Sequence, residues 1–568
     1  MKPDRTGALA RLLPGLPALL AVAAIYTGSL LLLPAGGFWI NDNASKFLQM
    51  RSIIAGHYRD YAITLPGREV DPDLLFNPLT PPYFHVSGKT VYSQYSLVFA
   101  LLSSLPYRAL GHRGLYLLPV LSSLFMLAGC ARIAVLLGAD KRATGVIVAL
   151  AALATPVWFY SLTFWEHTPA ACLLIWGLYH LLRSLPGGDR RRMFLGSLLL
   201  GLAVAFRDEL YLFLPVAVGV ILLRAREGRR GAAVAAAAGG LAGILPLWLL
   251  QWRALGAPLG FHLGSSLPAG REIVKQLLAR PRVFHDLFLA AGSNAVLSVA
   301  LSAPFAVAVF FGFRRAGRAP GATALATLAS LCGLVFLGGF QRAGGIMPWL
   351  MASNSLWPAA PVLILAFLAP SPGDGQPSRR TILEIALLYA AVYWLSTPDW
   401  RVSGLHWGNR LLFILYPLLA IPAGMNLAAA WRGAETGRVW RRSALAAVTA
   451  VSLAAQIFSL GLLHGRLEFS RRVNDAVSQD PAAAIVSDLW WVPQELYTAT
   501  LERPVFLVGS PRMLPVLLER LCSGGYRDYL MVTSRRAGGQ GRPAAARVED
   551  TRFGFFTVDL VRGRTCRE

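Results

Sequence analysis

Long apolar runs separated by short polar stretches make up most of the chain from Leu12 to Leu463. Most runs have roughly 17 to 25 residues, which is enough for a helix to cross about 30 Å of hydrocarbon. Because a helix satisfies its own backbone hydrogen bonds, the pattern predicts an α-helical polytopic membrane protein with about thirteen transmembrane helices. The predicted spans are Leu12–Leu33, Leu115–Leu137, Ala143–Tyr160, Thr168–Leu185, Phe194–Phe206, Leu210–Leu223, Ala232–Trp252, Ala295–Phe313, Ala322–Phe340, Trp349–Ala369, Ile382–Leu395, Leu411–Ala430 and Ala444–Leu463.

The pattern changes at about His464, where charged residues and turn signals become frequent. Short β-rich runs flank a stretch with helical apolar spacing, so we predict a small α/β domain at 464–568 after a membrane domain at 1–463. Arg536–Arg547 is rich in Gly, Ala and Arg, which is typical of a flexible loop. The β-rich runs are Ala484–Val486, Val505–Val508, Tyr529–Val532 and Phe555–Leu560, and the helical stretch is Pro511–Leu521.

The composition agrees with a membrane protein. Of the 568 residues, 55% are hydrophobic and only 15% are charged, and the mean hydropathy is +0.50. The net charge of +24 comes from short Arg clusters between apolar runs. Such clusters set membrane orientation and contact anionic lipids, so we predict membrane lipids as partners and no nucleic acid.

The basic loops also predict which side each loop faces. Keeping them in the cytoplasm places the N-terminus inside, a long first loop at 36–113 outside, and the C-terminal domain outside. The apolar piece Tyr95–Leu110 in that loop is then a helix at the membrane interface. The high content of Ala, Gly, Leu and Arg suggests a high-GC bacterium, so we predict that the chain lies in a bacterial inner (cytoplasmic) membrane. Only Cys522 and Cys566 are placed to form a disulfide, which requires an oxidising compartment.

Asp42 stands in the polar stretch Phe38–Phe47, just after the first predicted span. A carboxylate held at the membrane surface can take a proton from a substrate hydroxyl while a lipid-bound donor stays in the bilayer. That would make Asp42 a general base. The structural alternative is that Asp42 and Asn43 cap a helix at Ala44–Ala55. The two roles are compatible, and both stay open.

A second acid, Glu166, follows Phe164-Trp165 and precedes His167 at another predicted outer helix end. One interpretation is a helix N-cap region beside an aromatic belt. The other is a second catalytic acid, with His167 orienting the substrate. A divalent cation would need ligands beyond this loop, so Asp42 would have to join it. We therefore predict no metal ligands and no required cofactor, and leave a divalent cation open as an alternative.

Three cations are candidates for binding a donor phosphate: Lys89, Arg207 and Arg410. A guanidinium offers planar donors and a charge that does not titrate away. The structural alternatives are snorkelling of the arginines at outer helix ends and a plain interfacial anchor at Lys89. Nearby side chains expected to orient the substrate are Tyr92, His406 and Trp407.

The order of these features resembles the GT-C superfamily of polytopic glycosyltransferases, which includes protein O-mannosyltransferases and the lipid A aminoarabinose transferase. The likeness covers about 460 residues. It lies in the order of the elements along the chain and in the side of the membrane that each loop faces. The matching features are Asn41-Asp42, Gly88-Lys89 through Tyr92-Ser93-Gln94-Tyr95, Glu166, Phe206-Arg207, and Trp407-Gly408-Asn409-Arg410 before a span that contains Pro417.

The resemblance implies a polyprenyl-phosphate sugar donor, an inverting displacement on the outer face, Asp42 as general base and Glu166 as the second-loop acid. Here a single acid stands between two asparagines, where some members have an acidic pair. That departure leaves the subfamily and metal use open.

The resemblance therefore predicts an enzyme, a glycosyltransferase that moves a hexosyl or pentosyl group to an extracytoplasmic acceptor: a lipid-linked glycan, an envelope polymer or a protein. Two other classes stay open, a transporter or flippase of lipid-linked intermediates and a non-catalytic membrane scaffold. Polar groups near the bilayer midplane and paired repeats would favour a transporter. In this sequence the candidate residues fall at one predicted face, and we find no repeat.

Overall fold

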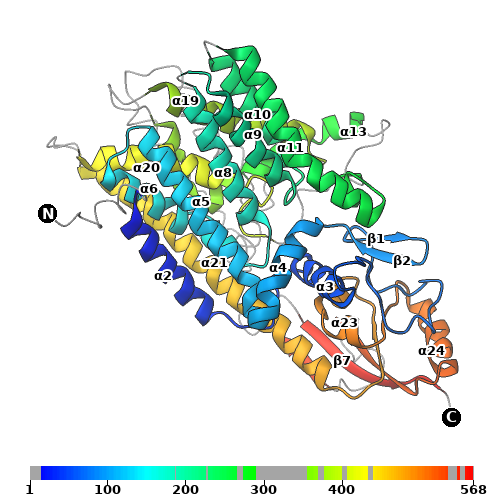
Figure 1. Cartoon of the computed structure of the whole chain (residues 1–568). Coiled ribbons are helices and arrows are strands. Elements are labelled where there is room, and N and C mark those ends of the chain that lie inside the picture. The colour runs from blue at the N-terminus through cyan, green and yellow to red at the C-terminus, as the bar shows by residue number, and fades with distance from the viewer. Residues whose placement is uncertain are drawn as a thin grey trace, which may run out of the picture. The chain divides into compact units, whose positions relative to one another are not determined.

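The computed structural model of the chain describes residues 14–185, 187–225, 228–264, 273–289, 355–368, 376–398, 406–432, 439–534, 546–549 and 557–566. The described fold is mostly helical, with several apolar helices and a mixed five-stranded sheet near the C-terminus (Figure 1). The predicted fold class is confirmed at that level. The chain divides into two compact units: Met1–Leu30, Pro119–Leu247 and Ser266–Leu460 in the first, and Leu31–Leu118, Trp248–Ser265 and Gly461–Glu568 in the second.

Helices form at most of the apolar runs. Three helical stretches of the described chain are long and apolar enough to cross a bilayer, namely Leu97–Leu136, Arg229–Leu255 and Leu445–Gln479, and shorter apolar helices accompany them. The chain is thus a multi-pass membrane protein. The helices that coincide wholly or in part with predicted spans are α2 (Leu16–Leu32), α5 (Leu117–Leu136), α6 (Lys141–Leu153), α8 (His167–Ser184), α9 (Arg190–Val204), α10 (Leu210–Arg224), α11 (Arg229–Leu255), α19 (Gln376–Ser396), α20 (Leu415–Arg432) and α21 (Val439–Gln479).

Two predicted spans are wrong as single helices because prolines interrupt them. The span Ala143–Tyr160 divides at Pro156 into α6 and the short α7 (Val157–Ser161). The described part of Trp349–Ala369 forms α18 (Leu356–Ala359) and the 3₁₀ helix η4 (Pro361–Phe367). Proline lacks an N–H donor and disfavours the helical conformation of the residue before it. The spans predicted at 295–313 and 322–340 lie outside the described residues.

In the first unit, α8 and α9 pack closely through small residues. A Cβ atom on Gly177 would lie 2.8 Å from the carbonyl oxygen of Gly196, and one on Gly196 would lie 2.8 Å from that of Gly177. Small residues let helix backbones approach in membranes. A short turn joins the two helices, so they run antiparallel. The start of α8 at Glu166 and the chain after α9 at Arg207 therefore reach the same end of the pair.

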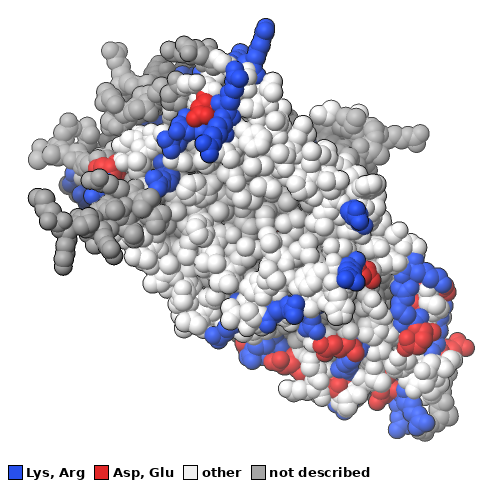
Figure 2. Space-filling model, in the orientation of Figure 1, with Lys and Arg blue, Asp and Glu red and all other residues white. Residues whose placement is uncertain are grey.

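Basic side chains gather at the other end of these helices. Asp189 caps α9 by accepting from the Arg192 N–H at 3.2 Å. Arg224, the last residue of α10, and Arg380 of α19 both donate to Glu384, at 2.6 and 2.9 Å. Figure 2 shows a broad surface without charged side chains over the first unit, with Lys and Arg gathered at its end. That is the distribution expected of helices whose basic loops stay on one side of a bilayer.

The second unit joins the first loop to the C-terminal part of the chain. Its C-terminal sheet has the strand order β4-β3-β5-β7-β6, with β3 parallel to β4 and β5, and β7 antiparallel to β5 and β6. The four predicted strands and the predicted helix are confirmed. Their bounds are β3 Ala484–Ser487, β4 Val505–Leu507, β5 Asp528–Thr533, β7 Thr557–Arg564 and α24 Leu514–Ser523.

One further strand was missed. β6 (Ala546–Glu549) pairs with β7 and begins inside the stretch predicted as a flexible loop. That prediction is wrong at Ala546 and Arg547, because the pairing supplies backbone partners that composition does not reveal. Residues 536–545 of the stretch lie outside the described residues.

Alternating side chains of the sheet pack against different layers. Ile485 faces the end of α21, where Phe469 and Val473 belong to the same buried cluster. Val486 belongs to a second cluster with Leu517 of α24 and with Phe76 of the first loop. The Leu507 N–H also donates to the Phe76 carbonyl at 2.9 Å, so the first loop covers the edge of β4. The first loop and the C-terminal sheet therefore share one core.

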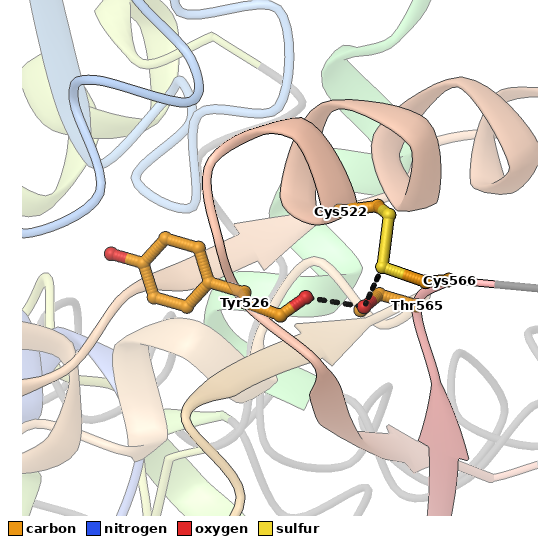
Figure 3. Close-up of a disulfide and its surroundings, with 4 residues drawn as sticks. All are labelled: Cys522, Tyr526, Thr565 and Cys566. Carbon is orange, nitrogen blue, oxygen red and sulfur yellow. Dashed lines mark hydrogen bonds between the residues drawn. A yellow bond between two sulfur atoms is a disulfide. The ribbon is translucent and has the colours of Figure 1, made fainter.

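A disulfide closes the C-terminal domain, as Figure 3 shows. Cys522 of α24 and Cys566 after β7 are joined, with their Cα atoms 5.2 Å apart. The pairing that the sequence allowed is thus present. Next to it, the Thr565 hydroxyl donates to the Tyr526 carbonyl. The Tyr526 hydroxyl donates to Glu69 at 2.6 Å, and this bond, with partial burial, raises the pKa of Tyr526 to about 12.

Replacing both Cys522 and Cys566 by Ser should lower the free energy of unfolding of this domain by about 4 kcal/mol, because the link spans 44 residues and restricts the unfolded chain. Proteolysis of the full-length protein across a urea series measures the change. Cys172→Ser, at a free cysteine of α8, is the control and should leave the midpoint unchanged. Equal midpoints for the double variant and the wild type would contradict the prediction.

Candidate functional site

The helix that follows the first span is polar in sequence but almost wholly buried. α3 (Asn41–Ala55) begins three residues before the predicted start. Asn43 accepts the Ile40 N–H at 3.2 Å, which is one half of a capping box. Asp42 lies in the first turn, is only 5% exposed, and accepts the Tyr95 hydroxyl at 2.6 Å through Oδ1. An acid at this position is also stabilised by the positive end of the helix dipole.

Two more side chains of α3 contact the same tyrosine. The ammonium group of Lys46 lies 3.5 Å from the centre of the Tyr95 ring, and Lys46 is only 2% exposed. The amide of Gln49 donates to the Tyr95 carbonyl oxygen at 3.1 Å. Asp42, Lys46 and Gln49 follow one another at helical spacing, so a single face of α3 surrounds Tyr95.

A neighbouring face of α3 is bound to the C-terminal domain. The Asn41 amide donates to Gln494 Oε1 at 2.8 Å, and the Ser45 hydroxyl donates to the same oxygen at 3.5 Å. Gln494 belongs to the short helix α22 (Val492–Glu495). The next residue, Glu495, forms a buried ion pair with Arg466 at 2.8 Å. Side chains far apart in sequence thus supply hydrogen-bond partners to a buried polar helix.

The stretch around Lys89 forms a β-hairpin of β1 (Phe84–Ser87) and β2 (Thr90–Ser93). Gly88 adopts φ +58, as a tight turn requires. Lys89 stands exposed at the tip, and among the described residues it makes no hydrogen bond or ion pair. The half-buried Tyr92 faces Phe261 of α12 (Gly260–Gly264), with ring centres 6.0 Å apart. The hairpin leads directly into Tyr95.

In the first unit, Glu166, Arg207 and Glu209 form a buried ion cluster. Arg207 Nη1 donates to Glu166 Oε1 at 2.9 Å, and Arg207 Nε donates to Glu209 Oε1 at 2.7 Å. The Arg207 side chain is only 13% exposed. Burial alone would lower the pKa of Arg207, but the charges of Glu209 and Glu166 outweigh it and raise that pKa above its ordinary value. Glu166 stands at the N-cap position of α8.

A cavity of about 20 Å³, enough for one water-sized molecule, lies beside this cluster. Arg207, Glu209 and His167 line it together with Tyr389 of α19 and Phe413. His167 is buried, and its ring packs against Tyr160, Trp165 and Phe413 at centre distances of 4.8, 4.9 and 5.8 Å.

The stretch His406–Arg410 forms a tight, buried turn. Gly408 adopts φ +63, and a Cβ there would lie 2.5 Å from the Tyr416 hydroxyl oxygen. That hydroxyl accepts the Asn409 N–H at 2.7 Å. His406 Nδ1 bonds to the Gly408 carbonyl at 2.7 Å, and Trp407 donates to Gln456 at 3.0 Å. These contacts set the direction in which the chain presents Arg410.

Arg410 itself lies over the Trp165 ring, with its guanidinium carbon 5.6 Å from the ring centre. A guanidinium over an aromatic face is attracted by the ring electrons. Trp165 immediately precedes Glu166, so the turn brings Arg410 to the residues that begin α8. The structure therefore brings together three of the predicted residues of the first unit, Glu166, His167 and Arg207, and places Arg410 next to their loop.

No group of three or more His, Cys, Asp or Glu side chains that could hold a metal ion occurs in the described part of the chain. Asp42 belongs to the second unit and Glu166 to the first. Each acid is accompanied by a cation within its own unit, Lys46 near Asp42 and Arg207 at Glu166.

Several contact partners of the candidate residues were missed from the sequence. Lys46 stands four residues after Asp42 and Glu209 stands two after Arg207, so local spacing could have indicated both. Tyr95 ends the stretch from Gly88 that the sequence analysis singled out, but nothing in the sequence connects its hydroxyl to Asp42. Gln494 carries no local signal at all, because it reaches α3 from a position 453 residues beyond Asn41.

Comparison with solved structures gives a likeness over nearly the whole chain. ArnT from Cupriavidus metallidurans bound to undecaprenyl phosphate is 12% identical, covers 98% of each chain, and has a TM-score of 0.52. The structure of the same ArnT in the apo state is 14% identical. That match covers 96% of this chain and 97% of the ArnT chain, with a TM-score of 0.49. The apo oligosaccharyltransferase from Archaeoglobus fulgidus is 12% identical. That match covers 91% of this chain and 69% of the oligosaccharyltransferase, with a TM-score of 0.49.

No protein-family model matches the sequence, and a comparison with curated proteins gives no match. The likeness to the ArnT complex is one of fold, at low sequence identity. The resemblance to the GT-C glycosyltransferases is confirmed at the level of the fold.

Replacing Arg207 by Ala should lower the free energy of unfolding by about 3 to 5 kcal/mol, because Glu166 and Glu209 would keep their charges in a buried place without the cation. Thermal unfolding in detergent, followed by tryptophan fluorescence, measures the loss. The matched variant Glu166→Gln/Arg207→Met/Glu209→Gln removes all three charges and should recover most of the stability. An Arg207→Ala protein as stable as the wild type would show that the cluster does not support the fold.

Proposed function

We propose that this chain is a membrane glycosyltransferase that transfers one sugar from a polyprenyl-phosphate carrier to a hydroxyl group on the outer side of the cytoplasmic membrane. The fold likeness to ArnT, whose structure contains undecaprenyl phosphate, supports a lipid-phosphate donor. The observation that carries the proposal is the buried Asp42 carboxylate, held at 2.6 Å by the Tyr95 hydroxyl in the first turn of α3. Burial at a helix start is a suitable setting for a general base.

In the proposed reaction, the acceptor oxygen attacks the anomeric carbon of the sugar. The bond from that carbon to the phosphate oxygen breaks, and polyprenyl phosphate leaves with the bonding electrons. Asp42 takes the proton of the acceptor hydroxyl, and the configuration at the anomeric carbon inverts. The base acts mainly late in the step, when the hydroxyl has become acidic, and cations stabilise the charge that grows on the phosphate.

The three predicted phosphate-binding cations differ in their surroundings. Arg207 already bonds to two carboxylates, so a phosphate would compete with Glu166 and Glu209 for it. We therefore assign Arg207 to holding Glu166 in place. Arg410 in the first unit and the exposed Lys89 in the second are the two separate candidates of the proposal for binding the phosphate. An arginine suits a phosphate because its donors are planar and always charged. A divalent cation remains the alternative source of positive charge.

The predicted substrate-orienting residues divide in the same way. His406 and Trp407 are buried and bonded within their own turn, so we propose that they direct Arg410 toward the donor. His167 lines the small cavity beside Glu166. Tyr92, half-buried on the hairpin that carries Lys89, is the member of this group best placed to touch an acceptor. The acceptor class is a lipid-linked glycan, an envelope polymer or a protein.

The orientation we propose places the N-terminus in the cytoplasm and the C-terminal domain outside a bacterial inner membrane. The basic helix ends around Arg224 and Arg380 support the inner side. The Cys522–Cys566 disulfide supports an oxidising compartment for the C-terminal domain.

Alkaline phosphatase, which folds only in an oxidising compartment, tests this orientation. Fused to the C-terminus of the full chain it should be active, and fused after Gly187, in the turn between α8 and α9, it should be inactive. Expression of each fusion is checked by immunoblotting. The reverse pattern of activity would overturn the orientation and with it the outer-face site.

The two rival functions make different demands on the chain. A transporter usually places polar groups along its path near the membrane midplane. The ion cluster described here instead stands at helix ends, with Glu166 before α8 and Arg207 between α9 and α10. A scaffold would need no buried carboxylate at α3. These observations favour the enzyme.

Sugar transfer in membranes tests the enzyme directly, using a panel of radiolabelled polyprenyl-phosphate sugars. Asp42→Asn should reduce transfer by about 100-fold or more, because it removes the general base. Asp73→Asn, at an exposed acid of the same loop, is the matched control and should keep full activity.

Two outcomes of that assay would contradict the proposal. Wild-type rates for Asp42→Asn would remove Asp42 from the chemistry. Failure of the wild type to consume any donor, with acceptor glycans and lipids present, would favour the transporter or the scaffold.

A further inference from the structure

The polar face of α3 is built around a single tyrosine. The Asp42 carboxylate accepts from the Tyr95 hydroxyl, the Lys46 ammonium lies over the Tyr95 ring, and Gln49 binds the Tyr95 carbonyl. The tyrosine is thus held at its hydroxyl, its ring and its backbone by one helix. A residue whose backbone and side chain are both held in this way has little freedom to change its hydrogen bond.

The position of Lys46 affects the strength of that hydrogen bond. Its ammonium group is 3.5 Å from the ring centre, and the side chain is 2% exposed, so little solvent screens its charge. A cation over a phenol ring draws electron density from the ring and makes the hydroxyl a better proton donor. The acceptor of that proton is the Asp42 carboxylate, 2.6 Å away. A hydrogen bond to the charged form of an acid favours that form.

We propose that Tyr95 and Lys46 are positioning residues, which keep Asp42 deprotonated and fix the direction of its carboxylate. The inference rests on the proposed function, since it explains how Asp42 stays ready to accept a proton. Within the described residues, the ionisable groups near this arrangement include His262 of α12, whose ring stacks 6.1 Å from that of Tyr95, and the Arg466–Glu495 pair beyond Gln494.

Labelling with dicyclohexylcarbodiimide tests the arrangement without a sugar substrate. The reagent adds to the protonated form of a carboxyl group in an apolar setting, so the extent of labelling at Asp42 falls as pH rises. The full-length protein in detergent is labelled across a pH series, and mass spectrometry of the α3 peptide gives the labelling midpoint.

The midpoint for Asp42 should move upward by about one pH unit in Tyr95→Phe, which removes one hydroxyl and keeps the ring. Lys46→Met should move it in the same direction, whereas Lys46→Arg keeps the charge and should restore the wild-type midpoint. Tyr107→Phe is the control: it removes another hydroxyl of the same unit, which accepts from Arg51. The control should leave the midpoint where it is.

An unchanged midpoint in Tyr95→Phe would overturn the proposal, and so would equal midpoints for Lys46→Met and Lys46→Arg. If Lys46→Met does not fold, Tyr95→Phe decides alone, because it changes a single atom. A shifted midpoint in a protein that transfers no sugar would uphold the arrangement and contradict the proposed function. The two failures are therefore distinguishable.

Discussion

The burial of a polar helix is the constraint on which the second unit depends. α3 carries asparagine, aspartate, serine, lysine and glutamine, and nearly all of these side chains are shielded from solvent. A buried polar group that lacks a hydrogen-bond partner is costly, so each face of this helix needs partners from elsewhere. Tyr95 supplies them on one face and Gln494 on the neighbouring one. The first loop, the hairpin and the C-terminal domain are joined because they share this requirement.

In the first unit, buried polar groups are paired through opposite charges. Its helices pack through apolar surface and small residues such as Gly177 and Gly196, and the polar residues stand where helices begin and end. There Arg207 links Glu166 to Glu209, so two loops are held by one guanidinium. The guanidinium of Arg207 is itself engaged with these two carboxylates.

The sequence predicted the helices well and the contacts between them poorly. Apolar runs identified α2, α8, α10 and α11 because a membrane requires long uninterrupted apolar helices. The same reasoning failed at Pro156 and at Pro361, where a proline ended a helix inside an apolar run. In the C-terminal domain, short β-rich runs identified the strands β3, β4, β5 and β7. They missed β6, whose order comes from pairing with β7 and not from its own composition.

By itself, the sequence determined the membrane class, the polar loop that carries Asp42, and the order of acids and cations along the chain. Each of these follows from local composition and spacing. Only the tertiary structure decided that Tyr95 donates to Asp42, that Gln494 binds Asn41, and that Arg207 is shared by two glutamates. The physical reason is that hydrogen bonds and ion pairs act over a few ångströms in space. Their partners are brought together by packing, which leaves no mark at a fixed distance along the chain.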